Sequence, residues 1–465
     1  MSEIKVNKIS PRSGTTVTLG DSGDTFTIPS GATISGVGAV QWDTTKKTAD
    51  FTGESGRGYF IDTGSGAVTI TLPASPSAGD IVAIVDYAGT ADTNNITIGR
   101  NSSKINGTTS DLVMTKNDSG ITLLFVDATE GWKNIETSNL NDIELTPEYI
   151  AASGGTESTS GDFKIHTFTG PGTFNVSAVG NSAGSQTVQF LSVGGGGGGG
   201  VDNGGGGGGA GVIKASASPV GVSAYPISIG GGGAGQPAPA CNTTPGAIGT
   251  VTTFFGVTVL GGGGGRSDGG GVSPGTVGNG GGGAGVSSST AGCSGNPITP
   301  VPGDVTVFSN NAGGDGTNGT CSVFRSGGGG GAAATGNPGI PGPTSAFGGA
   351  GTPDDISGST LIYGGGGGGG VYCNAAGAGG AGGAGGGGGG IAPGGGGPTN
   401  SPGGAAGASG TNAGTAGSPT SSGGGQGGPA GANTGSGGGG GGRSGTSGGG
   451  NGGSGITIIK YKFQN

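Results

Sequence analysis

The feature that most constrains this chain is a set of uninterrupted glycine runs in its C-terminal part. Of the 129 glycines among 465 residues, 105 lie after residue 193. Glycine destabilises an α-helix interior by about 1 kcal/mol relative to alanine, so long helices are excluded there. Collagen is also excluded, because glycine does not recur strictly at every third position. Runs of five or more glycines occupy residues 194–200, 204–209, 261–265, 327–331, 364–370, 385–390 and 437–442.

Residues 392–455 show the consequence most clearly. They contain no valine, isoleucine, leucine, methionine, cysteine or aromatic residue, and Arg443 is their only charge. A side-chain core cannot form there, and one interpretation is a disordered linker. The other is a bundle of polyglycine-II rods, which have three residues per turn and direct every N–H and C=O outward. Because glycine has no Cβ, such rods can approach closely enough to bond backbone to backbone, and we predict packed rods joined by loops.

Charge divides the chain at the same place as glycine. The net charge of −9 belongs entirely to residues 1–193, and the remainder is neutral. Phosphate recognition needs clustered Lys and Arg, which do not occur, so we expect no nucleic-acid partner. No run of about 18 apolar residues occurs, so we expect no membrane insertion.

The sequence predicts an all-β protein: a short N-terminal β stalk, a small β-sandwich, and a glycine-rich domain that mixes β-strands with polyglycine-II helices. Short apolar alternations separated by turn residues are typical of strands. The predicted domains are an attachment or stalk segment (1–39), a β-sandwich (40–137), a linker (138–160) and a glycine-rich distal domain (161–465). In the distal domain we expect strands at residues 164–168, 186–193, 212–217, 225–229, 254–260 and 456–463, the first pairing with the last.

Several spaced motifs resemble a family of bacteriophage tail-fibre proteins, marine phages especially. Those of the middle domain are Tyr59-Phe60-Ile61-Asp62-Thr63, the segment 70–82, Asp86-Tyr87-Ala88-Gly89-Thr90 and the segment 126–132. The opening segments 6–11 and 22–31 are also similar to the start of such fibres. Residues 160–465 resemble the glycine-rich distal domain of these fibres, through the segment 166–174, Phe190-Leu191-Ser192-Val193 before a glycine run, and the terminal Gly455-Ile456-Thr457-Ile458-Ile459. The resemblance implies a homotrimer whose glycine-rich bundle carries host-recognising loops.

Aromatic and amide side chains between the glycine runs are the best candidates for receptor binding. Rigid aromatic rings combined with adaptable amides suit contacts with sugars or proteins; the alternative is that these rings plug the ends of rods. The candidates are Phe308, Asn310, Asn311, Phe324, Phe347, Tyr372 and Asn374.

The sequence supports neither catalysis nor a cofactor. His166 is the only histidine and stands apart from any nucleophile motif. Asp354 and Asp355 are adjacent and read as a solvated turn, whereas a glycoside hydrolase needs two separately placed carboxylates. No metal-ligand spacing occurs. Four cysteines leave two states open, and they are Cys241, Cys293, Cys321 and Cys373. They could form two disulfides in a protein that works outside the cell, or remain free thiols because the fibre would be assembled in a reducing cytoplasm.

The sequence therefore predicts a non-enzymatic tail fibre that attaches the virion to the host cell surface. Its expected partners are other copies of itself, virion tail proteins at its N-terminus, and a host surface glycan or outer-membrane protein. It would be assembled in the host cytoplasm and act outside the cell. The alternatives are a capsid-decorating fibre, a polyglycine-bundle ice-binding protein and a polysaccharide depolymerase.

Overall fold

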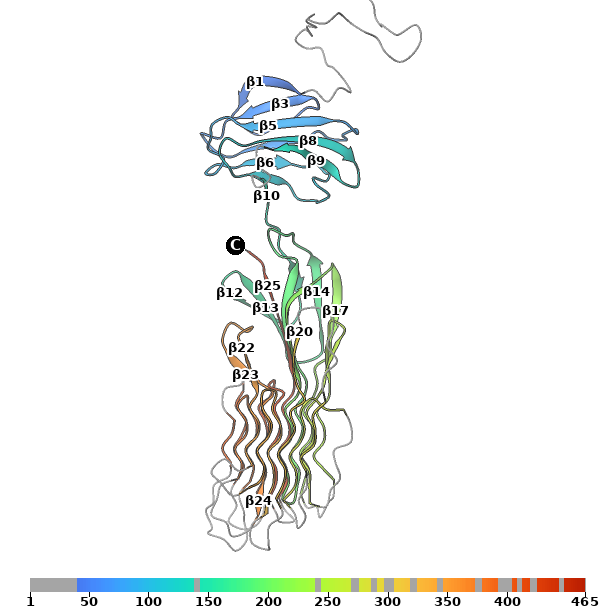
Figure 1. Cartoon of the computed structure of the whole chain (residues 1–465), viewed down its shortest axis with the longest axis vertical. Coiled ribbons are helices and arrows are strands. Elements are labelled where there is room, and N and C mark those ends of the chain that lie inside the picture. Colours follow the sequence, from blue (N-terminus) through green and yellow to red (C-terminus); the bar gives the residue numbers. More distant parts are fainter. Residues whose placement is uncertain are drawn as a thin grey trace, which may run out of the picture. The chain divides into compact units, whose positions relative to one another are not determined.

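The chain divides into two units between Thr146 and Pro147, and each is described by itself (Figure 1). The computed structural model describes residues 40–137, 143–238, 244–268, 276–285, 291–296, 305–317, 324–340, 346–372, 379–391, 404–407, 412–418, 425–442 and 447–464. The expected N-terminal stalk lies outside these residues. The part described is all-β, as predicted.

The N-terminal unit is a sandwich of two five-stranded sheets. The first has the order β1 (Gln41–Lys47), β3 (Arg57–Ile61), β5 (Ile81–Asp86), β8 (Gly120–Asp127) and β9 (Gly131–Thr137). The second has the order β10 (Ile143–Leu145), β7 (Leu112–Met114), β6 (Ile96–Gly99), β4 (Val68–Thr71) and β2 (Phe51–Thr52). Residues of both sheets share one core, because alternate positions such as Val68 and Ile70 face inward while Thr69 and Thr71 are half-buried. The ring of Trp132 is fully buried in this core and meets Phe125 edge-on.

The C-terminal unit begins with two further sheets. One has the order β11 (Ala151–Ser153), β14 (Gly172–Ala178) and β17 (Ser223–Ile227). The other has the order β12 (Thr156–Ser160), β13 (Phe163–Phe168), β25 (Ile456–Lys462), β15 (Thr187–Val193), β16 (Val212–Pro219) and β20 (Val305–Phe308). The expected pairing of the first and last distal strands is confirmed, with Phe163 opposite Lys462 and Phe168 opposite Thr457. The six-stranded sheet is buried on both faces, since Ile459 and Ile458 belong to different apolar clusters.

Two segments differ from the sequence-based expectation. The predicted linker, 138–160, contains β10, β11 and β12, which are too short for their pairing with β7, β14 and β13 to be read from the sequence. The predicted single strand over 254–260 is instead a hairpin of β18 (Thr252–Phe254) and β19 (Val257–Val259). The chain turns at Phe255 and Gly256, both of which have positive φ. Two more strand pairs are β21 (Phe324–Arg325) with β24 (Val371–Tyr372), and β22 (Thr352–Asp354) with β23 (Leu361–Tyr363).

The glycine runs form rods that are bonded sideways with a three-residue period. In the rod 194–200, N–H groups three residues apart donate to the same neighbouring rod, and consecutive groups donate to three different rods. This is the geometry of a helix with three residues per turn and no internal hydrogen bonds, as in polyglycine II. The six bonds are Gly195 to Thr250, Gly198 to Ala247, Gly196 to Gly453, Gly199 to Gly450, Gly197 to Gly208 and Gly200 to Gly205, all with N···O distances of 2.9 to 3.0 Å.

The carbonyl groups of this rod bond to three other neighbours. They accept N–H groups from the segments 262–265, 233–236 and 438–441, again with a three-residue period. The rod 194–200 is thus surrounded by six others, and each N–H and C=O from Gly195 to Gly200 has a partner. The bundle therefore satisfies buried backbone groups without any side chain, which is what a core made of peptide groups requires.

Close approach explains why these positions are glycine. A Cβ built on Gly195, Gly197 or Gly199 would lie 2.0 to 2.1 Å from a carbonyl oxygen of a neighbouring rod. The same bonding extends into residues 392–455, where Gly428 donates to Gly389 and Gly450 donates to Gly439. The described part of that segment is consequently packed rod and not isolated coil.

Candidate functional site

The glycine bundle has one end fixed in the sheets and one end away from them. The rod 194–200 leaves β15, turns at Val201–Asn203 and returns to β16 through residues 204–211. Figure 1 shows β24 at the end of the rods opposite the sheets of this unit. We call this the free end, and define it by Val201–Asn203, Arg266–Asp268, β21 and β24.

Hydrogen bonds hold the rods together at the free end. The Val201 N–H donates to Ser267 Oγ at 2.9 Å, and the Ser326 N–H donates to the Gly370 carbonyl at 3.0 Å. The Ser326 hydroxyl donates to the Asn203 carbonyl at 2.5 Å. Segments far apart in the sequence are therefore fixed next to one another at the ends of their rods.

Three of the predicted receptor-binding residues lie toward the free end. Phe324 and Tyr372 are direct partners in the β21–β24 pair, although 48 positions separate them in the sequence. Phe347 is half-buried, and its carbonyl accepts the Asn337 N–H at 2.8 Å. Asn374 lies outside the described residues.

The other three predicted residues lie near the sheets. Phe308 is the last residue of β20 and packs against an apolar cluster that includes Val212 and Tyr363. The Asn311 side-chain amide donates to the carbonyls of Gly331 and Ala332, at 2.7 and 3.1 Å. Asn310 is exposed, with φ of 78°. The structure thus divides the predicted set between the two ends of the bundle.

Sequence reasoning missed polar atoms at the free end. Within the described residues, Nε of Arg266, Nε of Arg325 and Oδ1 of Asn203 are buried without a hydrogen-bond partner. Such atoms are rare, and each calls for a ligand, an ion or a water to complete its bonding. The available signal was that Arg266 directly follows one glycine run and that Asn203 directly precedes another.

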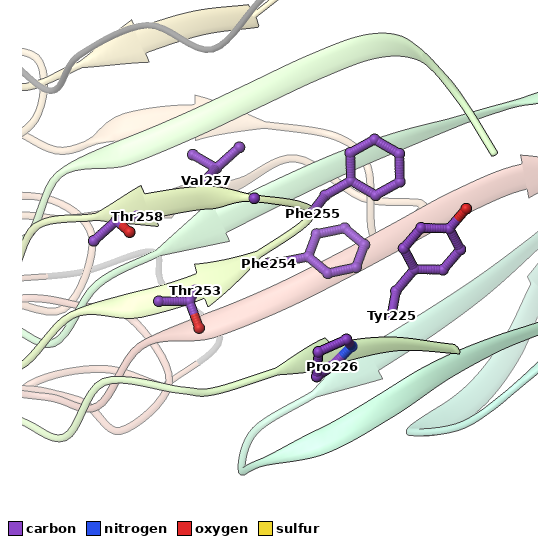
Figure 2. Close-up of a pocket in the computed structure, with 8 residues that line it drawn as sticks. Tyr225, Pro226, Thr253, Phe254, Phe255, Val257 and Thr258 are labelled. Carbon is purple, nitrogen blue, oxygen red and sulfur yellow. The ribbon is translucent and has the colours of Figure 1, made fainter. Parts of the chain in front are cut away.

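A recess lies near the sheets, between β17 and the β18–β19 hairpin (Figure 2). Its volume is about 460 Å³, and it is lined by Tyr225, Pro226 and residues 253–258. The rings of Tyr225 and Phe255 are stacked, with centroids 5.0 Å apart and planes 28° apart. We call this recess the aromatic hollow. The sequence analysis did not identify it, because it depends on the turn at Phe255.

The isolated ionisable residues serve the fold. The buried His166 donates its Nδ1–H to the Gly154 carbonyl at 2.7 Å, and its Nε2 accepts the Tyr461 hydroxyl at 3.1 Å. Burial lowers the pKa of His166, so the ring is neutral near pH 7. Asp354 is buried and forms an ion pair with Lys214 at 2.6 Å. It is therefore not part of the solvated turn that the sequence suggested.

The described residues contain no cluster of three or more His, Cys, Asp or Glu side chains suited to a metal ion. They also contain no helix with the length and apolar character needed to span a bilayer. Cys293 is buried with a free thiol, and the other three cysteines lie outside the described residues.

One comparison with known proteins gives a match. A family model described as a glycine-rich domain matches residues 167–411, which is just over half of the chain. No curated protein matches the chain. The matched region begins inside β13 and covers most of the rods.

Proposed function

The chain belongs to the glycine-rich domain family, and we propose that it is a structural fibre protein of a bacteriophage particle that binds the host surface through the free end of its bundle. The observation that carries this proposal is the lateral bonding of the rods. A rod whose backbone is bonded to six neighbours is rigid, and it holds the chain segments at its end in fixed positions. A rigid scaffold that displays variable segments is a common way to build a recognition surface.

The free end offers chemistry suited to a cell surface. Phe324 and Tyr372 belong to the β21–β24 pair that ends the bundle. Arg325 follows Phe324 in the same strand, but its side chain is buried whereas Phe324 is half-buried, so the aromatic ring is the more accessible of the two. The host component in this proposal is a surface glycan or an outer-membrane protein.

The remaining parts of the proposal follow from the motif resemblance. The N-terminal segment would join the fibre to other tail proteins of the virion, and three copies would form one fibre. The protein would act without catalysis. Several weak tips on one particle would act together by raising the effective concentration at the surface. A capsid-decorating position would use the same free end, and microscopy of labelled particles distinguishes the two locations.

Binding of the purified full chain to host cells tests the proposal. Phe324→Ala combined with Phe347→Ala should reduce cell binding at least tenfold. Val222→Ala is the matched control, because Val222 is exposed, apolar and near the sheets. Failure of the wild-type chain to bind any cell that the particle infects would overturn the adhesin assignment. Thermal hysteresis in a freezing assay would instead favour the ice-binding alternative.

A further inference from the structure

The aromatic hollow has the construction of a small-molecule site. Its volume of about 460 Å³ falls within the range of roughly 300–1,000 Å³ that is typical of ligand pockets. Figure 2 shows the rings of Tyr225, Phe254 and Phe255 gathered at the tip of the hairpin. The Phe254 side chain is buried behind this surface and meets Phe190 edge-on, with ring centroids 5.1 Å apart. The surface of the hollow is thus supported by the core of the sheets.

The Tyr225 ring is fixed in place by its hydroxyl group. That hydroxyl accepts the Gly221 N–H at 2.8 Å and lies 3.2 Å from the Gly221 carbonyl, to which it donates. Because both bonds are made to the backbone of the connection between β16 and β17, the side chain cannot swing to another χ1 rotamer without breaking them. Tyr225 therefore presents its face to the hollow in one orientation, which reduces the entropy lost on binding.

Phe255 occupies a conformation that a bulky residue rarely adopts. Its φ is 53°, and Gly256 follows with φ of 74°. A two-residue hairpin turn with positive φ at both positions strongly favours Asn-Gly or Asp-Gly. A phenylalanine at the first position is strained, and strained backbone of this kind is concentrated at ligand sites. The unfavourable backbone conformation is tolerated, and it places the half-buried Phe255 ring next to Tyr225. An asparagine at this position would remove that wall of the hollow.

The polar groups around the hollow are neutral. The eight lining residues include no charged side chain, and the hydroxyl groups belong to Thr253, Thr258 and Tyr225. Thr253 shares a hydrogen bond of 2.6 Å with Ser228. Flat aromatic faces carry partial negative charge and attract polarised C–H groups. This combination matches a hexopyranose ring, which has an apolar C–H face and a rim of hydroxyl groups, and it offers no charged partner for an anionic ligand.

We propose that the aromatic hollow formed by Tyr225 and Phe255 binds a neutral hexopyranose unit of a glycan. This site is separate from the free end and goes beyond the function proposed above. The stacked pair of Tyr225 and Phe255 forms the apolar wall against which the C–H face of the sugar packs, and Thr253 and Thr258 supply hydroxyl groups to the lining. Weak binding at this site would hold the fibre near a glycan-covered surface while the free end engages its receptor.

The test is a titration of the purified full chain with neutral oligosaccharides. Cellotriose, maltotriose, chitotriose and α-mannotriose serve as probes, measured by calorimetry and by saturation-transfer NMR. At least one probe should bind, and Phe255→Asn should weaken its binding at least tenfold. This variant retains the fold because Asn-Gly suits the turn, and circular dichroism checks that it does. Tyr225→Leu should have a similar effect on binding.

Several outcomes would overturn the proposal. The first is that none of the four probes binds, and the second is that Phe255→Asn binds them as tightly as the wild type. The third is that Phe255→Asn changes the oligomeric state and not the sugar affinity, which would assign the hollow to a second copy of the chain. Phe324→Ala is the control for independence from the free end, and it should leave the oligosaccharide affinity unchanged. Cell binding by the wild-type chain without binding of any oligosaccharide would refute the aromatic hollow alone, and oligosaccharide binding without cell binding would refute the free-end function alone.

Discussion

One added methyl group should destabilise the bundle strongly at Gly197 and hardly at all at Gly231. A Cβ on Gly197 would lie 2.1 Å from the carbonyl oxygen of Gly263, whereas a Cβ on Gly231 meets nothing closer than the Thr250 hydroxyl at 3.8 Å. Ordinary contacts begin near 3.4 Å. In Gly197→Ala the rod 261–265 must therefore move away by more than about 1 Å, since packed interiors have little room to absorb extra volume.

That movement acts on specific hydrogen bonds. Gly262 donates to Gly195 at 2.8 Å, and Gly265 donates to Gly198 at 2.9 Å, and both bonds lengthen when the rod moves. A buried group left without its partner costs about 1–3 kcal/mol, so the loss is roughly 2–6 kcal/mol for the two bonds together. Alanine also reduces the conformational entropy of the unfolded chain, which stabilises the folded state by about 0.4–1 kcal/mol. We expect a net loss on the order of 3 kcal/mol in the free energy of unfolding for Gly197→Ala.

The measurement must report on the C-terminal unit alone. Both tryptophans, Trp42 and Trp132, belong to the N-terminal unit, so tryptophan fluorescence is unsuitable. Hydrogen exchange of peptides from residues 147–465 of the full chain follows the rod amides directly. Amides of the rod 194–200 should exchange much faster in Gly197→Ala and at the wild-type rate or slower in Gly231→Ala. Equal protection in the two variants would refute the idea that glycine is needed for the approach of neighbouring rods.

Three further predictions concern ionisable groups of the C-terminal unit. Burial lowers the pKa of His166 from its ordinary 6.5, so the unfolded state takes up the proton first and stability should fall as the pH drops below 6.5. Denaturant unfolding between about pH 7.5 and 5 should show this slope in the wild type and not in His166→Gln. Burial raises the pKa of Tyr461 from 10.0 to about 12, so its contribution to stability should disappear as the pH rises through that interval, and Tyr461→Phe should lack this loss. Asp354→Asn should lower stability by on the order of 2 kcal/mol, because it removes the charge of a buried carboxylate that pairs with the exposed Lys214 ammonium, while Asp355→Asn at the exposed neighbouring position should have no measurable effect. Thermal unfolding that ranks these two variants equally would contradict the burial argument.

The sequence was sufficient to predict the packed rods and the terminal strand. Residues 392–455 have no side chains to build a core, so lateral backbone bonding was the one ordered state open to them, and Gly428 and Gly450 are bonded in this way. The β-branched segment at 456–463 was predicted as a strand; β25 covers Ile456–Lys462 and pairs with β13 as expected. These predictions succeeded because local composition leaves few physical alternatives.

The sequence was not sufficient to predict which rods are neighbours. Gly196 bonds to Gly453, which is 257 positions away, and nothing in two glycine runs distinguishes this partner from any other. The turn at Phe255 was missed for a related reason, because a bulky residue with positive φ contradicts local preference. The candidate binding residues were also chosen by type alone, and type does not say at which end of a rod a residue lies.

A lattice of identical rods raises the question of what fixes its register. Sliding one rod by three residues, about 9 Å at the polyglycine-II rise, would restore every backbone bond, so glycine alone permits many arrangements. Buried polar side chains where rods begin and end remove this freedom. The Asn279 amide donates to the Ala210 carbonyl at 2.9 Å and its oxygen accepts the Asn311 N–H at 3.1 Å, and the Ser436 hydroxyl donates to Gly385 and accepts from Gly365. A slide of one turn would leave each of these groups buried without a partner, at a cost that the repeated backbone bonds cannot offset. Glycine thus determines that the rods pack, and the few polar residues at their ends determine the single register in which they do so.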